Sequence, residues 1–390
     1  MSGTIPIIAQ PSNLPMTFSR NASLNSNTNL LPLEGSSLLF DSTFNGEQQA
    51  ESILRQMGRE IPDKVYSQVA EMPKRSPIYD ELLSQIDTQE GLQKFKEYQK
   101  TDNEKIISEL KTRKKAASRE FARSADQYEV AIKPIRAKIK TDDMDGRSHI
   151  SAIYDTIENI NSNYQKSFGE ITKNATKYME SLNSALGKMS KNLESAPDGK
   201  IKLFKNRVFD DLNESMKMYY KASKFQSIKS GNNDTFEVGY TKILDEIYTG
   251  DAQNPNINKD KLVEYMEPIS SFDHSESALS FWEKKLDGQG FIVVKANNKI
   301  NIYPDMNSVK IIYNSVRAVT GKEYGEVEIL TQVFQSLQTG IDSQKNAVNN
   351  SISRLLETFR QDNSHFETLT QLLIQLLKDL FQYNAGFANT

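Results

Sequence analysis

A regular apolar seam runs from Ile150 to Leu193, in the sequence ISAIYDTIENINSNYQKSFGEITKNATKYMESLNSALGKMSKNL. Its apolar residues recur at steps of three and four that average about 3.6, which is the period of an α-helix. Residues 197–199, Pro-Asp-Gly, stop the pattern. We predict one continuous helix over residues 146–196. The members of this first seam are Ile150, Ile153, Ile157, Ile160, Tyr164, Phe168, Ile171, Ala175, Tyr178, Leu182, Ala185, Met189 and Leu193.

A second seam begins at Leu330 and continues to Phe387, and only Gln344 and Asp362 interrupt its apolar character. Two helices of roughly 70 and 90 Å cannot each bury a seam on a small domain, so we expect them to pair. Compact folding of the residues between them makes the pair antiparallel. The other members of the second seam are Phe334, Leu337, Ile341, Val348, Ile352, Leu355, Phe359, Phe366, Leu369, Leu373, Leu376, Leu380 and Tyr383.

The predicted fold class is mainly α, with a long intramolecular antiparallel coiled coil, an N-terminal helical hairpin and a small inserted α/β module that contains a β-hairpin. The core of the coil is expected to hold Ile157, Ile160, Tyr164, Phe168, Ile171 and Leu182 on the first helix. On the second helix it is expected to hold Leu337, Ile341, Val348, Ile352, Leu355 and Phe359.

The rest of the chain divides by composition. Residues 1–45 are rich in Ser, Asn, Thr and Pro, and we predict that they are disordered, either a plain tail or an export segment. Residues 46–145 show helical patterns broken near Thr101–Asn103, which favours a helical hairpin whose second arm kinks or ends at Pro134. A mixed α/β module is expected over 197–323, at the far end of the coil, and the second coil helix over 324–390.

Within the module, residues 291–294 and 300–303 flank Asn297 and Asn298, which predicts a β-hairpin with a turn at the asparagines. A short helix from Ala278 to Leu286 carries the single tryptophan, Trp282.

Bulk composition argues against several function classes. The formal net charge is −3 and the basic residues are spread along the chain, so no nucleic-acid partner is expected. The absence of cysteine excludes disulfides and Cys-based zinc sites. No apolar run is long enough to span a bilayer, and the N-terminus lacks the pattern of a cleaved secretory signal.

The sequence offers no catalytic constellation, so we expect no enzyme, no cofactor and no metal site. His149, His274 and His365 are isolated from one another, and for His365 surface packing is favoured over metal binding. The acidic residues 142–145 lack the register of an EF-hand loop, and Gly288 and Gly290 precede a strand rather than a helix.

Two features of the last helix leave alternatives open. The dense apolar segment 369–381 fits packing against a third helix, an exposed contact with an oligomer or partner, or, least well because polar residues interrupt it, insertion into a membrane. Gln344 and Asp362 fit register devices or a local opening to water. If Asp362 only sets register, replacing it by leucine is expected to raise thermal stability.

The order of parts resembles that of the type III secretion needle-tip proteins of the IpaD, SipD and BipD kind. The sequence is similar to them in four stretches: 196–203, APDGKIKL; 281–286, FWEKKL; 299–305, KINIYPD; and 363–369, NSHFETL. The resemblance covers roughly residues 46–390 in architecture and is most literal after Ile150. The chain is longer than is usual for the family, and its N-terminal third matches only in helical style.

The resemblance implies a virulence protein that is secreted by the type III machine and sits at the tip of its needle on the bacterial surface. It implies a self-chaperoning hairpin packed along the coil, a small ring of subunits, a pentamer, and control of translocator release during host-cell invasion. The implied partners are the needle subunit, the translocator proteins and other copies of the chain. Some members bind bile salts between hairpin and coil, so bile salts are a candidate ligand. The candidates for contact with the needle or a neighbouring subunit are Asn363, Phe366, Leu369, Leu373, Leu376, Leu380 and Phe381.

Two other hypotheses about the function compete with a needle-tip role. A secreted membrane-active or pore-forming helical protein would make liposomes leak on its own. An intracellular coiled-coil regulator of export would not be found on the outside of needles.

Overall fold

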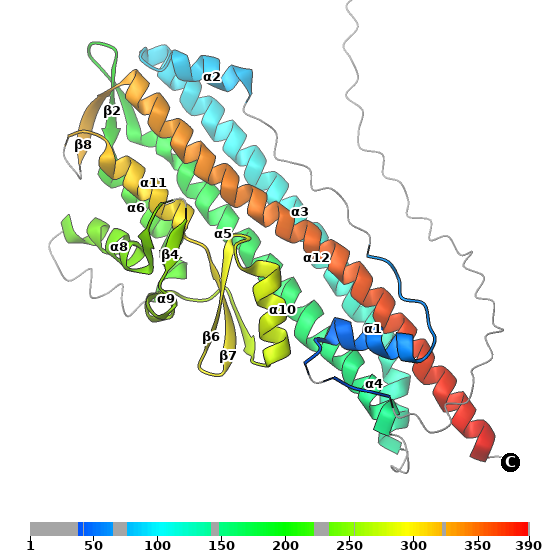
Figure 1. Ribbon diagram of the computed structural model, residues 1–390. Helices are drawn as coiled ribbons and strands as arrows, with labels where there is room; N and C mark the ends of the chain where they lie inside the picture. Colours follow the sequence, from blue (N-terminus) through cyan, green and yellow to red (C-terminus); the bar gives the residue numbers. More distant parts are fainter. Residues whose placement is uncertain are drawn as a thin grey trace, which may run out of the picture. The chain divides into compact units, whose positions relative to one another are not determined.

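A computed structural model describes residues 38–41, 43–64, 76–141, 148–221, 234–252, 254–321 and 325–388, which belong to one compact unit (Figure 1). The helices are α1 Gly46–Gln56, α2 Pro77–Ser84, α3 Gln89–Thr141, α4 Ser148–Asn159, the π-helix η1 Ile160–Lys166, α5 Ser167–Lys188, the 3₁₀-helices η2 Met189–Asn192 and η3 Lys217–Tyr219, α6 Lys205–Met216, α8 Asp234–Ile247, α9 Lys259–Tyr265, α10 Glu276–Leu286, α11 Asn307–Ala318 and α12 Thr331–Ala388. The strands are β1 Leu193–Ala196, β2 Lys200–Phe204, β3 Tyr248–Gly250, β4 Pro255–Ile257, β5 Ser270–Asp273, β6 Phe291–Ala296, β7 Lys299–Pro304 and β8 Glu326–Leu330.

The predicted coil is present. The helical stretch from α4 to η2 packs along α12, and the contacts run in opposite directions along the two helices. Asn183 Nδ2 donates to Asn349 Oδ1 over 2.9 Å, while the rings of Phe168 and Phe359 lie 5.2 Å apart. Earlier residues of one helix therefore meet later residues of the other, which confirms the antiparallel pairing.

Both seams lie in the core of the coil. Every residue of the first seam is buried, and so is every residue of the second seam from Phe334 to Leu376 except Gln344, which is half-buried. The π-helix η1 covers residues 160–166, where the apolar residues of the first seam take two successive steps of four. A π-helical turn is wider than an α-helical one, so it keeps these residues on the same face.

The ends of both seams differ from the prediction. The first helix ends at Asn192 rather than at residue 196, because Leu193 begins strand β1. The second begins at Thr331, and Leu330, 53% exposed, ends strand β8. Strands β1 and β8 flank β2 in an antiparallel sheet. Strands this short carry too few residues for their alternation to be separated from a helical period.

The N-terminal hairpin exists, but its turn lies elsewhere. Helix α2 folds back on α3 through residues 85–88, and the Tyr79 ring lies 5.7 Å from the Phe95 ring. The predicted break at Thr101–Asn103 is wrong, because α3 continues through it. Asn103 fits against α5 where Gly187 leaves room, since a Cβ at residue 187 would lie 2.4 Å from the side-chain amide carbon of Asn103.

Pro134 also lies inside α3 and does not end it. A proline in a helix removes one backbone hydrogen bond. The buried side chains of Ile132 and Ile135, on either side of it, hold this part of α3 in the core. Tertiary packing therefore overrides the local preference to break.

Helix α3 is a third partner of the coil and lies beside α5 and α12 in Figure 1. It runs antiparallel to the first coil helix, as the ion pairs Lys114–Glu180 at 3.4 Å and Arg136–Glu158 at 2.7 Å show. This arrangement explains the broad apolar face of α12. Ile374, Leu377 and Phe381 are buried although they flank the seam, as expected for packing against further helices.

The inserted module contains the predicted β-hairpin. Strands β6 and β7 pair from Phe291↔Pro304 to Ala296↔Lys299. Asn297 and Asn298 connect them with φ of 53° and 57°, as a two-residue type I′ turn requires. Strand β5 lies beside β7 as a third strand of the sheet, and the sequence pattern did not predict it.

The module does not sit only at the far end of the coil. Helix α10 and strand β5 lie against the middle of the first coil helix, with Trp282 in contact with the rings of Tyr164 and Phe168. The apolar face of α10 needs a partner surface, and the coil supplies it. The expected distal position is therefore corrected to one in which the module folds back along the coil.

Two sequence predictions lie partly or wholly outside the described residues. These are most of the disordered segment 1–45 and the acidic group 142–145. The described end of the first segment has defined structure, because the Leu39 N–H donates to Gln56 Oε1 over 2.8 Å. Asn45 and Gln48 then form a capping box that starts α1.

Candidate functional site

Aromatic rings join the inserted module to the coil in a cluster that we call the tryptophan junction: Tyr164, Phe168, Phe281 and Trp282. The Tyr164 and Phe281 rings lie 4.6 Å apart and the Phe168 and Trp282 rings 5.4 Å apart, both edge to face. Trp282 is fully buried. Edge-to-face contacts add to the burial of apolar area, so this junction fixes α10 on the coil.

An ion pair lies beside the same junction. Lys285 Nζ of α10 donates to Asp362 Oδ2 of α12 over 2.6 Å, and the Asp362 side chain is 6% exposed. Asp362 therefore does not face water, and its partner belongs to the module rather than to the other coil helix. Polar pairs that span the coil itself include Asn183–Asn349 and Gln165–Asn363, and the sequence pattern predicted neither.

A second contact between module and coil, the tyrosine junction, consists of Tyr178, Tyr219, Tyr248 and Asp305. The Tyr178 hydroxyl donates to the Asp305 carbonyl over 3.3 Å, and the Met306 N–H donates to the Tyr248 hydroxyl over 2.7 Å. Burial raises the pKa of the Asp305 carboxyl and raises the pKa of Tyr219 to about 12. Hydroxyl and backbone groups hold this junction.

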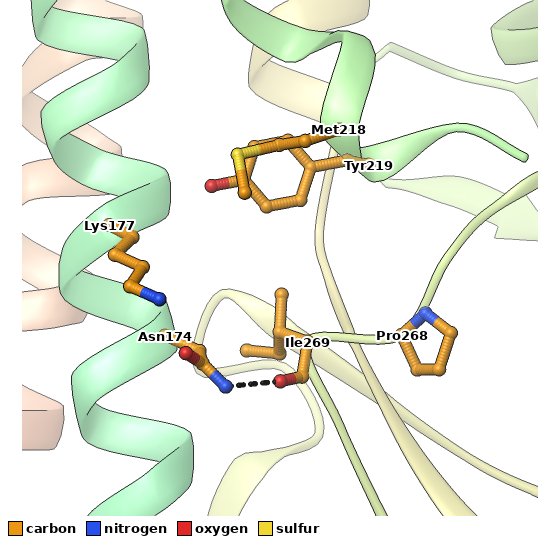
Figure 2. A pocket seen from close by; sticks show the side chains of 6 residues that line it. All are labelled: Asn174, Lys177, Met218, Tyr219, Pro268 and Ile269. Atoms are coloured by element: carbon orange, nitrogen blue, oxygen red, sulfur yellow. Dashed lines mark hydrogen bonds between the residues drawn. The ribbon is translucent and has the colours of Figure 1, made fainter. Parts of the chain in front are cut away.

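A small cavity opens beside the tyrosine junction, between α5 and the module (Figure 2). Its volume is about 160 Å³, and Asn174 Nδ2 closes one side by donating to the Ile269 carbonyl over 2.6 Å. The lining residues are Asn174, Lys177, Met218, Tyr219, Pro268 and Ile269. Pockets for drug-sized ligands measure roughly 300–1,000 Å³, so this one fits only a small guest.

A second cavity of about 60 Å³ lies between α3, η1 and α12, next to Tyr128 and Ile374. This is the region between hairpin and coil where the resemblance suggested bile salts. A steroid would require α3 to move away from α12, so bile-salt binding stays a prediction.

The candidates for a needle or subunit contact are mostly internal. Asn363, Phe366, Leu369, Leu373, Leu376 and Phe381 are buried, and Leu380 is half-buried. Gln165 Nε2 donates to Asn363 Oδ1 over 3.3 Å, so the side-chain oxygen of Asn363 already has a hydrogen-bond partner within the chain. A partner could reach these residues only after neighbouring helices move, and the contact stays a prediction.

Helix α1 covers part of the candidate contact surface on α12, and the sequence pattern did not predict this contact. The Gly46 N–H donates to the Tyr164 hydroxyl over 3.3 Å, and a Cβ at residue 46 would lie 2.9 Å from the Tyr164 ring. Arg59, just after α1, pairs with Asp379 of α12 at 2.9 Å. The capping box at Asn45 was the available signal for this helix.

The histidines that the structure describes in full do not meet. His274 lies 3.1 Å from Glu276, whereas His365 is only 6% exposed, which corrects its predicted surface position. Within the described residues no helix is both long and apolar enough to cross a bilayer.

Comparisons with known proteins come from structure, since the sequence matches no family model and no curated protein. One solved structure of BipD from Burkholderia pseudomallei, described as a component of the type III secretion system, is 13% identical and covers 73% of this chain and 81% of that one, with a TM-score of 0.41. A second BipD structure is 12% identical and covers 87% and 96%, with a TM-score of 0.38. A third, described as an invasion protein associated with that system, is 13% identical and covers 72% and 81%, with a TM-score of 0.40.

Proposed function

We propose that this chain is a needle-tip protein of a bacterial type III secretion system. In this role it caps the needle, controls secretion and serves as a platform for translocator proteins during host-cell invasion. It is secreted by the same machine and stays at the needle tip on the bacterial surface. BipD is described as an invasion protein of such a system, and our proposal gives this chain the same class of role.

The observation that carries the proposal is the meeting of two stretches in which the sequence resembles the needle-tip family. Residues 281–286 and 363–369 are far apart in the chain, yet the Tyr164 ring contacts Phe281 of the first stretch and Phe366 of the second. Lys285 of the first stretch pairs with Asp362, which directly precedes the second. Two of the stretches that carry the resemblance therefore form one contact in the fold.

The position of α3 suggests how assembly is controlled. Helix α3 covers α5 and α12 along much of their length, so an isolated chain exposes little of the coil. We infer that α3 and α1 act as a self-chaperone and that their movement at the needle frees residues 363–381. The needle subunit, translocators and the other members of a pentameric ring are the proposed partners of that surface.

Deletion of the encoding gene tests the function. We expect unregulated secretion of translocators and loss of delivery into host cells, both restored by the wild-type gene. Antibody labelling of intact bacteria should place the chain at needle tips. Normal delivery by the deletion strain, or protein that remains inside the cell, would contradict the proposal.

A disulfide lock tests the movement of α3. The chain has no cysteine, and a Cβ at residue 187 would lie 3.1 Å from Asn103 Cβ, close to the usual disulfide range of about 3.5–4.5 Å. After oxidation, the double variant Asn103→Cys with Gly187→Cys should fail to assemble on purified needles and recover with reductant. Asn103→Cys alone and the reduced double variant are the controls, because a Cβ at residue 187 would lie 2.0 Å from the native Asn103 Nδ2. Equal assembly in the locked state would show that α3 need not move away from α5.

A further inference from the structure

A buried histidine and two glutamates meet between α1 and α12. Glu47 and Glu51 are one helical turn apart on α1, so their carboxylates share a face. His365 of α12 points its Nε2 at both: the distances to Glu47 Oε1 and Glu51 Oε1 are each 3.5 Å. Glu47 and His365 are buried, and Glu51 is half-buried.

These distances do not fit a hydrogen-bonded histidine. An N–H···O bond measures about 2.7–3.2 Å, and among the residues that the structure describes the buried His365 Nε2 has no hydrogen-bond partner. A protonated imidazole would gain by approaching one carboxylate. Instead, Nε2 stays equally far from the two oxygens, which leaves space among the three atoms.

That spacing does fit coordination of a metal ion. Zinc bonds of about 2.0–2.2 Å to nitrogen and oxygen at tetrahedral angles place neighbouring ligand atoms about 3.4 Å apart. The three ligand atoms here all lie within 4.8 Å of one another. One imidazole with two carboxylates is a donor set suited to Zn²⁺ and similar divalent ions, and a fourth position would remain for water.

Two cations already lie near the carboxylates. Lys64 pairs with Glu47 through the same Oε1 atom, and Arg55 Nη2 lies 3.7 Å from the other oxygen of Glu51. The Lys64 side chain is 25% exposed, so it can turn into solvent when a metal ion takes its place. Lys64 is thus a competitor of the metal and gives a way to test the site.

We propose that Glu47, Glu51 and His365 form a binding site for a divalent transition-metal ion, with Zn²⁺ as the best match, that clamps α1 onto α12. The ligands come from helices far apart in the sequence, so a bound ion cross-links the N-terminal cover to the last helix. Because a preformed site binds the ion only when α1 is docked, the metal stabilises that docked state by mass action.

The test is a titration of the full chain, treated with chelator, with ZnCl₂ in a calorimeter. We expect one ion per chain and a rise in the unfolding temperature. Glu51→Gln and His365→Ala should weaken binding by at least roughly tenfold, since each removes one of three ligands. Lys64→Gln should tighten it. Co²⁺ as a probe should show the visible absorption of a tetrahedral site in the wild type but not in Glu51→Gln or His365→Ala.

The matched controls are Glu60→Gln, an exposed carboxylate just after α1, and His274→Ala, a histidine outside the cluster. Both should bind Zn²⁺ as the wild type does. Absence of binding by the wild type, or equal binding by Glu51→Gln and His365→Ala, would overturn the proposal. If His365→Ala fails to fold, Glu51→Gln decides, because that side chain is partly exposed and keeps its shape.

Discussion

The two junctions between the inserted module and the coil are built from different chemistry. The tryptophan junction combines four aromatic rings with the Lys285–Asp362 pair. The tyrosine junction combines phenol hydroxyls and backbone groups around the Asp305 carboxyl, whose pKa burial raises. Both join the module to the same helical stretch, so the difference lies in how each is stabilised.

This difference predicts different sensitivities. Apolar area and a buried ion pair lose much when one partner is removed, since a cavity or an unpaired charge remains. Hydrogen bonds in the tyrosine junction each contribute less, but the junction should respond to pH because it holds a carboxyl with a raised pKa. The tryptophan junction should therefore contribute most of the stability, and the tyrosine junction should contribute most of the pH dependence of that stability.

The largest effect is expected from Phe168→Ala. The side chain is buried between Trp282 and Phe359, so its removal should cost about 3–5 kcal/mol in the free energy of unfolding. Urea unfolding followed by circular dichroism measures this. The control Val130→Ala, 77% exposed on α3, should change stability by less than about 0.5 kcal/mol. If Phe168→Ala changed the free energy of unfolding as little as Val130→Ala, the tryptophan junction would not dominate stability.

Next in size is Asp362→Leu, for which the structure reverses the sequence-based expectation. Leucine leaves the Lys285 ammonium without its partner, so we expect a loss of about 1–3 kcal/mol, reduced because Lys285 is 23% exposed. Adding Lys285→Met should recover most of this loss. The thermal unfolding of both single variants and the double variant gives the coupling energy. A more stable single variant would restore the view that Asp362 only sets register.

A smaller loss, about 1 kcal/mol, is expected from Gly46→Ala, since its methyl group would press on the Tyr164 ring. Gly340→Ala is the matched control, because a Cβ there meets nothing within 4 Å and alanine favours the interior of α12. That variant should gain about 0.5–1 kcal/mol. Hydrogen exchange of α1 amides shows whether Gly46→Ala loosens α1 alone. Unchanged hydrogen exchange would show that the contact of Gly46 with Tyr164 does not hold α1 on the tryptophan junction.

The smallest effect is the pH dependence from Asp305. Its pKa is raised in the folded chain, so folding favours the protonated carboxyl. The resulting stability is fully present below the unfolded pKa, near 3.9, and is lost as pH rises through the folded value. Asp305→Asn should be more stable than the wild type at neutral pH, and the difference should shrink toward pH 3. A difference independent of pH would contradict this.

Several of these residues show where sequence reasoning succeeds. The first seam is buried from Ile150 to Leu193, and the turn at Asn297 and Asn298 has the predicted form. Both signals are local: one is a period along a helix, the other a pair of residues that tolerate positive φ. Local signals fail where packing decides, as at Thr101–Asn103, where contact with α5 keeps α3 continuous.

Polar groups at the candidate sites were the hardest to place. Asp362 marks an interruption of the second seam, but its cation lies 77 residues earlier in the chain. His365 appeared to be a surface residue because its neighbours on α1 are more than 300 positions away. Periodicity reports which face of a helix is apolar and says nothing about which charged group stands opposite.

The sequence by itself determined two long helices with matching apolar faces, their antiparallel pairing and a β-hairpin in the insert, because each follows from spacing along the chain and from connectivity. Only the tertiary structure decided that α3 completes the coil, that the module folds back onto it and that α1 brings two glutamates to His365. These contacts depend on which surfaces remain to be covered once the coil has formed, and this is a property of the whole packed chain.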